Sequence, residues 1–198
     1  SEMSFTITNA IRWWVREHPT RVALDFDGEE LSYAGLHDWA SRVAVALIAD
    51  GVKPGDRVSI VAANTLDYAV LIVAIMLAGG IHAPLSFRSS ARELRQSLAT
   101  VTPALLFTDA DRAATAHEAL GEASVTALRS LETIRTLREA PAPAPGLLHR
   151  PEPDEPLFII GTSGSTGAPK GVVYSHRSVM TYAAEFVLMQ PRTGNGGS

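Results

Sequence analysis

Residues 57–84 read RVSIVAANTLDYAVLIVAIMLAGGIHAP, and the order of their apolar runs predicts the fold class. Residues 57–63 form a continuous apolar run of strand length, 67–78 an apolar run of helix length, and 81–84 a second short strand. Strands that are apolar along their whole length are typical of a parallel sheet buried on both faces, and a helix between two such strands connects them in parallel. This stretch therefore predicts an α/β fold.

The same alternation extends in both directions along the chain. Asp27-Gly28, the commonest two-residue hairpin signal, predicts a β-hairpin between an N-terminal helix and a helix that Gly51 ends. The further elements expected are helices over 5–18, 34–50, 92–98 and 111–120 and a strand over 104–108. We therefore expect a largely parallel sheet covered by helices on both faces, preceded by an N-terminal helix and hairpin.

The distribution of proline divides the chain into parts. Residues 1–140 are expected to form an N-terminal α/β subdomain, and 141–156, PAPAPGLLHRPEPDEP, an extended surface connection whose Asp154 and Glu155 are solvated. Residues 157–190 are expected to belong to the same large domain, with a helix from 176 to about 189 that Ser175 caps. The tail, 191–198, fits a native loop, a proteolytic edge or an engineered linker equally well.

Composition excludes several classes of protein. The 198 residues carry a formal net charge of −4, and their 17 Lys and Arg form no basic stripe, so nucleic-acid binding is not expected. The absence of cysteine excludes a disulfide framework and cysteine metal sites, and fits a cytoplasmic protein. The uncharged run over 69–78 is too short for a membrane-spanning helix, which needs about 20 apolar residues, so no integral membrane segment is expected.

Residues 158–176, FIIGTSGSTGAPKGVVYSH, predict a phosphate-binding loop. Gly161, Gly164 and Gly167 recur at every third position, and glycine lets backbone N–H groups approach an anion closely. Hydroxyl side chains between them add donors, and Lys170 adds a mobile positive charge. A flexible Gly/Ser linker is the alternative. The loop lies between two apolar runs of strand type, 157–160 and 172–174, which favours the binding loop.

Other glycine-rich motifs do not fit this segment. The Gly-Lys-Ser/Thr ending of P-loop nucleotidases is absent, and so is the Gly-x-Gly-x-x-Gly of dinucleotide-binding folds. The hydrolase pattern Gly-x-Ser-x-Gly fails because Ser165 stands where its closing glycine belongs.

Residues 162–171, TSGSTGAPKG, resemble at every position the core phosphate motif of the adenylate-forming enzymes, which include acyl-CoA synthetases, luciferases and peptide-synthetase adenylation domains. The segment LSYAGL at 31–36 resembles a further family signature, with Gly35 where Glu is usual. Residues 55–58 with Asn64, then 77–80 and 83–85, are similar to the next family segments. The resemblance runs from about residue 8 to about residue 188.

The resemblance implies an enzyme that joins a small carboxylic acid to ATP, releases pyrophosphate and passes the acyl group to CoA. The residues it assigns to the β- and γ-phosphates of ATP are Thr162, Ser163, Gly164, Ser165, Thr166, Gly167 and Lys170. Mg²⁺ is expected to arrive with ATP, because the histidines show no metal-ligand spacing. His176 matches a family histidine at a helix start, where we expect a structural role.

The resemblance also implies that this chain is the N-terminal portion of such an enzyme and is inactive alone. The family's adenine segment and its late catalytic lysine are not among these residues, so no catalytic residue is assigned within them. Ser86-Phe87 stands where amino-acid-activating relatives show Asp-Pro, which favours an acyl-CoA synthetase. The alternatives are a fatty-acyl-AMP ligase, an amino-acid adenylation domain, or a non-catalytic fragment that binds a nucleotide or anion.

Overall fold

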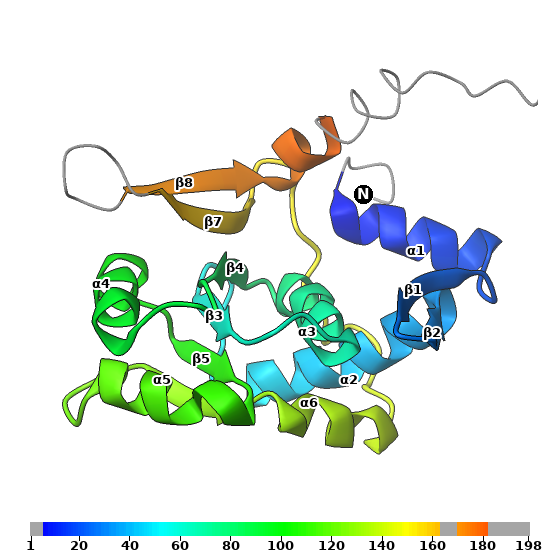
Figure 1. Cartoon of the computed structure of the whole chain (residues 1–198). Coiled ribbons are helices and arrows are strands. Elements are labelled where there is room, and N and C mark those ends of the chain that lie inside the picture. Colours follow the sequence, from blue (N-terminus) through cyan, green and yellow to red (C-terminus); the bar gives the residue numbers. More distant parts are fainter. Residues whose placement is uncertain (1–5, 163–169, 182–198) are drawn as a thin grey trace, which may run out of the picture.

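The structure, a computed structural model, describes residues 6–162 and 170–181 (Figure 1). Its strands are β1 (Val22–Phe26), β2 (Glu29–Ser32), β3 (Arg57–Val61), β4 (Ile81–Pro84), β5 (Leu105–Thr108), β6 (Ala127–Ser130), β7 (Pro156–Thr162) and β8 (Lys170–Ser175). Its helices are α1 (Ile7–Glu17), α2 (Tyr33–Ala49), α3 (Leu66–Leu77), α4 (Ala91–Val101), α5 (Ala113–Leu120) and α6 (Glu132–Thr136), with 3-10 turns η1 (Ala110–Arg112) and η2 (Leu137–Glu139). A further helix begins at His176.

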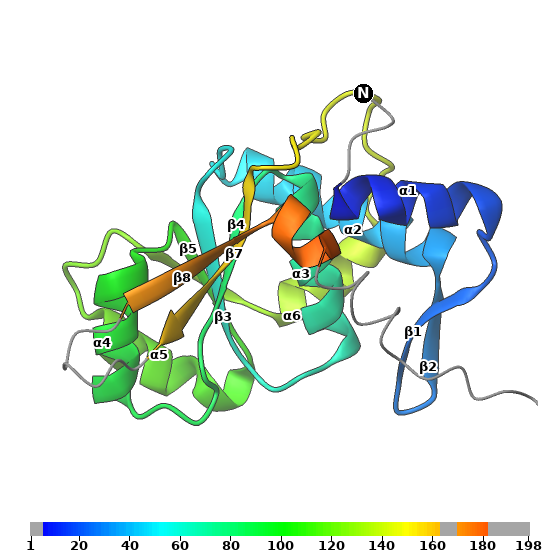
Figure 2. The same ribbon diagram turned by 90° about the horizontal axis from the view of Figure 1, so that it is seen from above.

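Six strands form one sheet in the order β6-β5-β3-β4-β7-β8. All neighbours in it are parallel except β7 and β8, which form an antiparallel hairpin at one edge. Figure 2 shows this hairpin crossing above the other strands of the sheet, with its loop end over α4. The expected parallel pairing of residues 57–61 with 81–84 is confirmed.

The sheet is buried on both faces, because alternate side chains of its central strands enter two different cores. Val58 and Ile60 of β3 belong to a cluster with α2, α3 and α6, whereas Val61 belongs to a cluster with α4 and α5. Leu106 of β5 shares the second cluster. The predicted α/β sheet covered by helices on both faces is thereby confirmed. Side chains of these strands point alternately to the two faces, but the sequence shows no alternation of apolar and polar residues because both faces are apolar.

The N-terminal helix and hairpin lie beside this body, as expected. Asp27 and Gly28 both adopt positive φ, 52° and 83°, the conformation that a two-residue hairpin turn requires. Asp25 Oδ1 accepts a hydrogen bond of 3.0 Å from the Gly28 N–H and closes the turn. The helix α2 that follows is capped by the Ser32 hydroxyl, which accepts from the Gly35 N–H at 3.0 Å. Gly35 has no carboxylate to complete the reciprocal cap.

Two elements were not expected from the sequence, and two others have different bounds. β6 and α6 hold only four and five residues, too few to show a period. α4 is longer than the predicted 92–98. It begins at Ala91, after the N-cap Ser90 that forms a capping box with Glu93, and it continues to Val101, where Thr102 in the left-handed conformation ends it. The helix expected over 111–120 begins as η1, which the Asp109 carboxylate caps by accepting from the Arg112 N–H at 3.1 Å.

The proline-rich connection is fixed to the body of the domain. The His149 N–H donates to the Leu77 carbonyl at 2.8 Å, and His149 Nε2 lies 2.7 Å from Glu155 Oε2. Arg177 Nε donates to Asp154 Oδ1 at 2.7 Å. The Asp154 side chain is 80% exposed even so, as expected of a solvated carboxylate, and the Glu155 side chain is 36% exposed and pairs with a histidine of the same connection.

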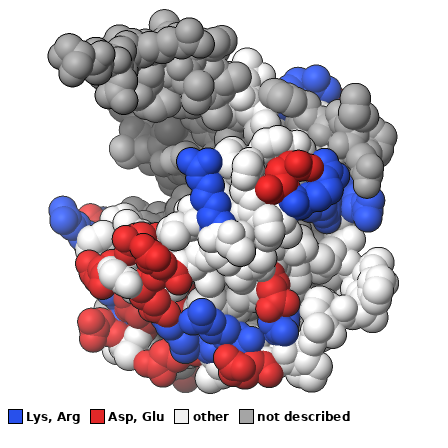
Figure 3. All heavy atoms as spheres, turned by 90° about the vertical axis from the view of Figure 1, so that its right-hand side faces the viewer, with Lys and Arg blue, Asp and Glu red and all other residues white. Residues whose placement is uncertain are grey.

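On the face in Figure 3, several acidic side chains gather at the lower left next to basic ones, and no basic stripe crosses the described residues of this face. None of the helices in the described part of the chain is both long and apolar enough to cross a bilayer.

Gly79 provides a test of how the connection is held. Gly79 has a φ of +82°, and a Cβ added to it would lie 2.9 Å from the His149 ring, whereas at Gly55, φ +88°, a Cβ would meet nothing within 4 Å. Gly55→Ala should cost about 1–2 kcal/mol of unfolding free energy through backbone strain, and Gly79→Ala about 1–3 kcal/mol more through the added clash. Urea unfolding measures both, and Gly79→Ala/His149→Ala should recover the difference. Equal losses of unfolding free energy in Gly55→Ala and Gly79→Ala would contradict the close contact between residue 79 and the His149 ring.

Candidate functional site

The ends of the predicted phosphate-binding loop meet across the β7–β8 hairpin. Thr162 ends β7 and pairs in register with Lys170, which begins β8. Gly161 pairs with Gly171, where an added Cβ would lie 2.8 Å from the Ile159 side chain, so the last glycine of the motif permits close approach of the two strands. The residues between, which include Ser163, Gly164, Ser165, Thr166 and Gly167, lie outside the described part of the chain.

The loop leaves the sheet at its carboxyl edge. β7 runs parallel to β4, with Phe158 opposite His82, so Thr162 lies toward the same edge as the ends of the other parallel strands. In open α/β sheets, ligands bind outside the carboxyl ends of the strands. The fold therefore presents the loop where the physics of such sheets places a binding site.

Three other loops at this edge are fixed to one another. Asp109 Oδ2 accepts from the Ala63 N–H at 2.9 Å, joining the loops after β5 and β3. Arg112 pairs with Asp109 and donates through Nε to the Phe87 carbonyl at 2.9 Å, joining the loop after β4. Sequence reasoning did not single out these residues; the Asp109 cap directly after a strand was the available signal.

The same edge carries positive charge beside an aromatic ring. The guanidinium carbons of Arg112 and Arg88 lie 4.7 and 5.3 Å from the centre of the Phe87 ring, which is 40% exposed. Stacking on a ring holds a guanidinium in place while leaving its N–H groups able to donate. Because Arg112 is paired with Asp109, Arg88 is the one of these two arginines whose charge no ion pair in the described residues balances.

His176 holds the base of the hairpin and has the structural role that its position suggested. Its ring is buried, and the ring atom Nδ1 accepts from the Ile7 N–H at 3.2 Å. The backbone N–H of His176 donates to the Glu155 carbonyl at 3.1 Å. Burial lowers the pKa of His176, which keeps the ring neutral and Nδ1 able to accept. The Ser175 hydroxyl accepts from the Ser178 N–H at 3.1 Å and caps the helix, as predicted; residues 182–189 of that expected helix lie outside the described residues.

Metal ligands do not gather in the described residues. No group of three or more His, Cys, Asp or Glu within 6–162 and 170–181 could hold a metal ion.

The arrangement of a glycine- and hydroxyl-rich loop at the carboxyl edge has a counterpart among known proteins. The sequence pattern of a family described as "AMP-binding enzyme" matches residues 11–197. The chain belongs to this family. Its fold is that of the N-terminal subdomain of adenylate-forming enzymes.

Relatives of this AMP-binding chain fall into more than one class. It is 33% identical over 178 residues to the phosphinothricin tripeptide synthetase PhsC of Streptomyces viridochromogenes, covering 89% of the chain and 16% of PhsC. It is 28% identical over 173 residues to the fatty acid–[acyl-carrier-protein] ligase ScoC of Streptomyces coeruleorubidus, covering 87% of the chain and 33% of ScoC. The chain thus spans a third or less of the length of these relatives.

Solved structures agree in fold. A putative long-chain-fatty-acid CoA ligase from Rhodopseudomonas palustris superposes with a TM-score of 0.79 at 24% identity, over 94% of this chain and 48% of that one. A fatty acyl-adenylate ligase from L. pneumophila, solved with acyl adenylate and pyrophosphate, gives a TM-score of 0.76 at 22% identity, over 94% and 33%.

His82, next to β7 in the sheet, should make the fold sensitive to acid. It is buried against Tyr68, its Nδ1 has no hydrogen-bond partner among the described residues, and burial lowers its pKa to about 4. In the unfolded chain, histidine takes up a proton near pH 6.5. Between pH 6.5 and 4 the unfolded state therefore binds more protons than the folded state, and the folded state becomes less stable as the pH is lowered. The loss from this group is about 3 kcal/mol.

The substitution His82→Phe removes this proton-binding group and should flatten the acid dependence over the same interval. Urea unfolding at pH 7 and pH 4.5 measures the change, and the exposed His117→Gln is the control that should retain the wild-type dependence. If His82→Phe lost as much unfolding free energy between pH 7 and pH 4.5 as the wild type does, groups other than His82 would be responsible for the loss of stability in acid.

Proposed function

We propose that this chain is the N-terminal part of an ATP-dependent, AMP-forming ligase and that residues 162–170 hold the β- and γ-phosphates of ATP. The observation that carries the proposal is the pairing of Thr162 with Lys170 at the carboxyl edge of the sheet, which places the two ends of a fully matching phosphate motif together. Family membership and the relatives that form acyl-adenylates support it.

The proposed reaction makes and breaks one bond at phosphorus. A carboxylate oxygen of the acid bonds to the α-phosphorus of ATP, the bond from that phosphorus to the bridging oxygen breaks, and pyrophosphate leaves with the electron pair. The loop's contribution is to stabilise the charge that collects on the leaving phosphates, since such transfers depend on positioning and electrostatics. Ser163, Ser165 and Thr166 donate hydroxyl hydrogen bonds in this proposal, and Lys170 offsets charge.

The residues present fit a nucleotide triphosphate. The motif supplies hydroxyl and ammonium donors, and the loop after β4 adds the guanidinium group of Arg88, which stacks on Phe87 at the same edge. Mg²⁺ bound to the phosphates neutralises part of their charge when present, and no metal-ligand cluster is needed from the described residues. The proposed division into an α/β subdomain (1–140), a connection (141–156) and a loop segment (157–190) assigns this site to one large domain.

For the second step we propose transfer of the acyl group to CoA, as in an acyl-CoA synthetase. Ser86-Phe87 after β4 supports this choice, whereas the similarity to PhsC supports an amino-acid adenylation domain and the similarity to ScoC supports a fatty-acid ligase with a carrier-protein acceptor. All of these share the adenylation step. The proposed compartment is the cytoplasm, where ATP and CoA are available.

Lys170 should matter to adenylation far more than to folding. The chain contains only two lysines, Lys53 and Lys170, and Lys53 is exposed, so Lys53→Ala is a matched control. In the full-length protein Lys170→Ala should lower ATP–pyrophosphate exchange by roughly tenfold to a hundredfold, since a hydrogen bond to a charged group is worth about 1.5–3 kcal/mol. Lys53→Ala should exchange at the wild-type rate. Equal exchange rates in Lys170→Ala and wild type would contradict the proposed role of the loop in the reaction.

The identity of the acceptor is tested by the product. Incubation of the full-length protein with ATP, Mg²⁺, CoA and a panel of fatty, aromatic and amino acids should give an acyl-CoA thioester, identified by mass spectrometry. Pyrophosphate release with acyl-adenylate retained and no thioester would instead assign the chain to an AMP ligase or a carrier-dependent enzyme. Omission of CoA is the control for adenylate formation alone.

A further inference from the structure

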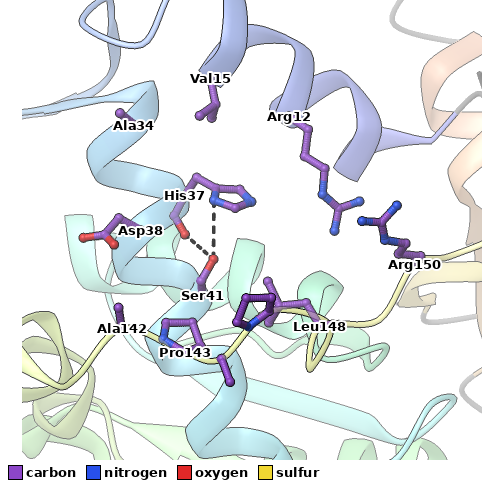
Figure 4. Close-up of a pocket in the computed structure, with 13 residues that line it drawn as sticks. Arg12, Val15, Ala34, His37, Asp38, Ser41, Ala142, Pro143, Leu148 and Arg150 are labelled. Atoms are coloured by element: carbon purple, nitrogen blue, oxygen red, sulfur yellow. Dashed lines mark hydrogen bonds between the residues drawn. The ribbon is translucent and has the colours of Figure 1, made fainter. Parts of the chain in front are cut away.

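A pocket of about 390 Å³ lies between α1, α2 and the proline-rich connection, apart from the phosphate loop. Figure 4 shows Arg12 from α1 and Arg150 from the connection pointing toward one another at one end of this pocket. His37 of α2 projects into it beside them. Sequence spacing does not connect these residues, because they come from segments far apart in the chain.

The two guanidinium groups face each other without a carboxylate between them. Arg12 Nη1 donates to Asn9 Oδ1 at 3.3 Å, and neither Arg12 nor Arg150 forms an ion pair within the described part of the chain. Burial and the neighbouring charge of Arg150 both lower the pKa of Arg12. Arginine stays protonated despite such shifts, so the pocket contains two repelling positive charges.

The nearby carboxylate does not neutralise them. Asp38 lines the pocket but is paired with Arg42, one turn further along α2. The positive charges of Arg12 and Arg150 therefore remain without a compensating carboxylate in the pocket. A dianion between the guanidinium groups would remove the repulsion and supply acceptors for both, whereas a singly charged carboxylate would leave one charge uncompensated.

His37 adds an unused polar group to the same wall. The Ser41 hydroxyl donates to the His37 carbonyl at 2.5 Å, and its oxygen lies 3.4 Å from His37 Nδ1. The other ring nitrogen, Nε2, is buried and has no hydrogen-bond partner among the described residues. A buried nitrogen without a partner costs free energy, and a ligand that bonds to it recovers that cost.

Much of the remaining lining is apolar. It includes Val15, on the same helix as Arg12, and Pro143, Pro145 and Leu148 of the connection. Small-molecule sites typically combine an apolar wall with a few convergent polar groups, in volumes of about 300–1,000 Å³. The pocket thus has room for a small organic group as well as for the anion.

We propose that this pocket binds a phosphate monoester of a small organic molecule, with the phosphate between Arg12 and Arg150 and the organic group against the prolines. Each guanidinium presents a fork of N–H donors that matches two phosphate oxygens. The ring of His37 lines the same pocket. The site is independent of the proposed ATP loop, and its occupation stabilises the contact between α1 and the connection.

The experiment is a calorimetric titration of the full-length protein at pH 7.5 with phenyl phosphate, inorganic phosphate and benzoate. A Lys170→Ala background removes the anion contact proposed for the ATP loop. Phenyl phosphate should bind more tightly than inorganic phosphate, because of the apolar wall, and more tightly than benzoate, because of its second charge. Benzoate binding as tight as phenyl phosphate would overturn the proposed ligand class.

Variants at the two arginines test the site itself. Arg12→Ala and Arg150→Ala should each lower the affinity for phenyl phosphate at least about tenfold, because each removes charged hydrogen bonds. Arg16→Ala is the matched control on α1, since Arg16 is exposed and paired with Glu17, and should bind as the wild type does. Arg12→Lys guards against misfolding: it keeps the charge but not the fork, and should bind with intermediate affinity. Wild-type affinity in both alanine variants would overturn the proposal.

Discussion

The placement of the phosphate loop depends on the attachment of β7 to β4. β7 joins the parallel body of the sheet through the register of Phe158 with His82, and β8 touches the sheet only through β7. The base of the hairpin is therefore held by other contacts, chiefly those of Glu155 with His149 and of His176 with Ile7 and Glu155. Because these contacts join the connection, the hairpin and α1, the loop's position at the carboxyl edge depends on all three.

The sequence predicted the body of the fold well, for a physical reason. The central strands are apolar on both faces, so residues 57–61 and 105–108 are recognisable by composition alone. β6 and α6 escaped prediction because they are short and only partly buried, so neither composition nor period marks them. The pairing of Asp154 with Arg177 was not predicted, because the fold brings together two residues that lie 23 positions apart in the sequence.

The candidate site was predictable only in part. The loop was predicted because glycine, hydroxyl residues and lysine occur together within ten consecutive residues, and its binding of phosphate stays a prediction. The network of Asp109, Arg112 and Phe87 could not, since it joins loops that follow separate strands and only the sheet brings them to one edge. Ile160, Val172 and Val173 of the hairpin remain 41–56% exposed, so the described residues leave the loop's supporting strands open on one side.

Arg12 and Arg150 are used differently from the arginines that join segments elsewhere in the described residues. Arg57 and Arg95 bind carbonyl groups at helix ends, and Arg129, Arg135 and Arg177 pair with carboxylates. In these places the guanidinium satisfies its donors within the protein and holds two segments together. Arg12 and Arg150 instead bring two segments together with a net repulsion between them. A protein segment held against that repulsion gains stability from an anion, so ligand binding there and the closeness of α1 to the connection are expected to be thermodynamically linked.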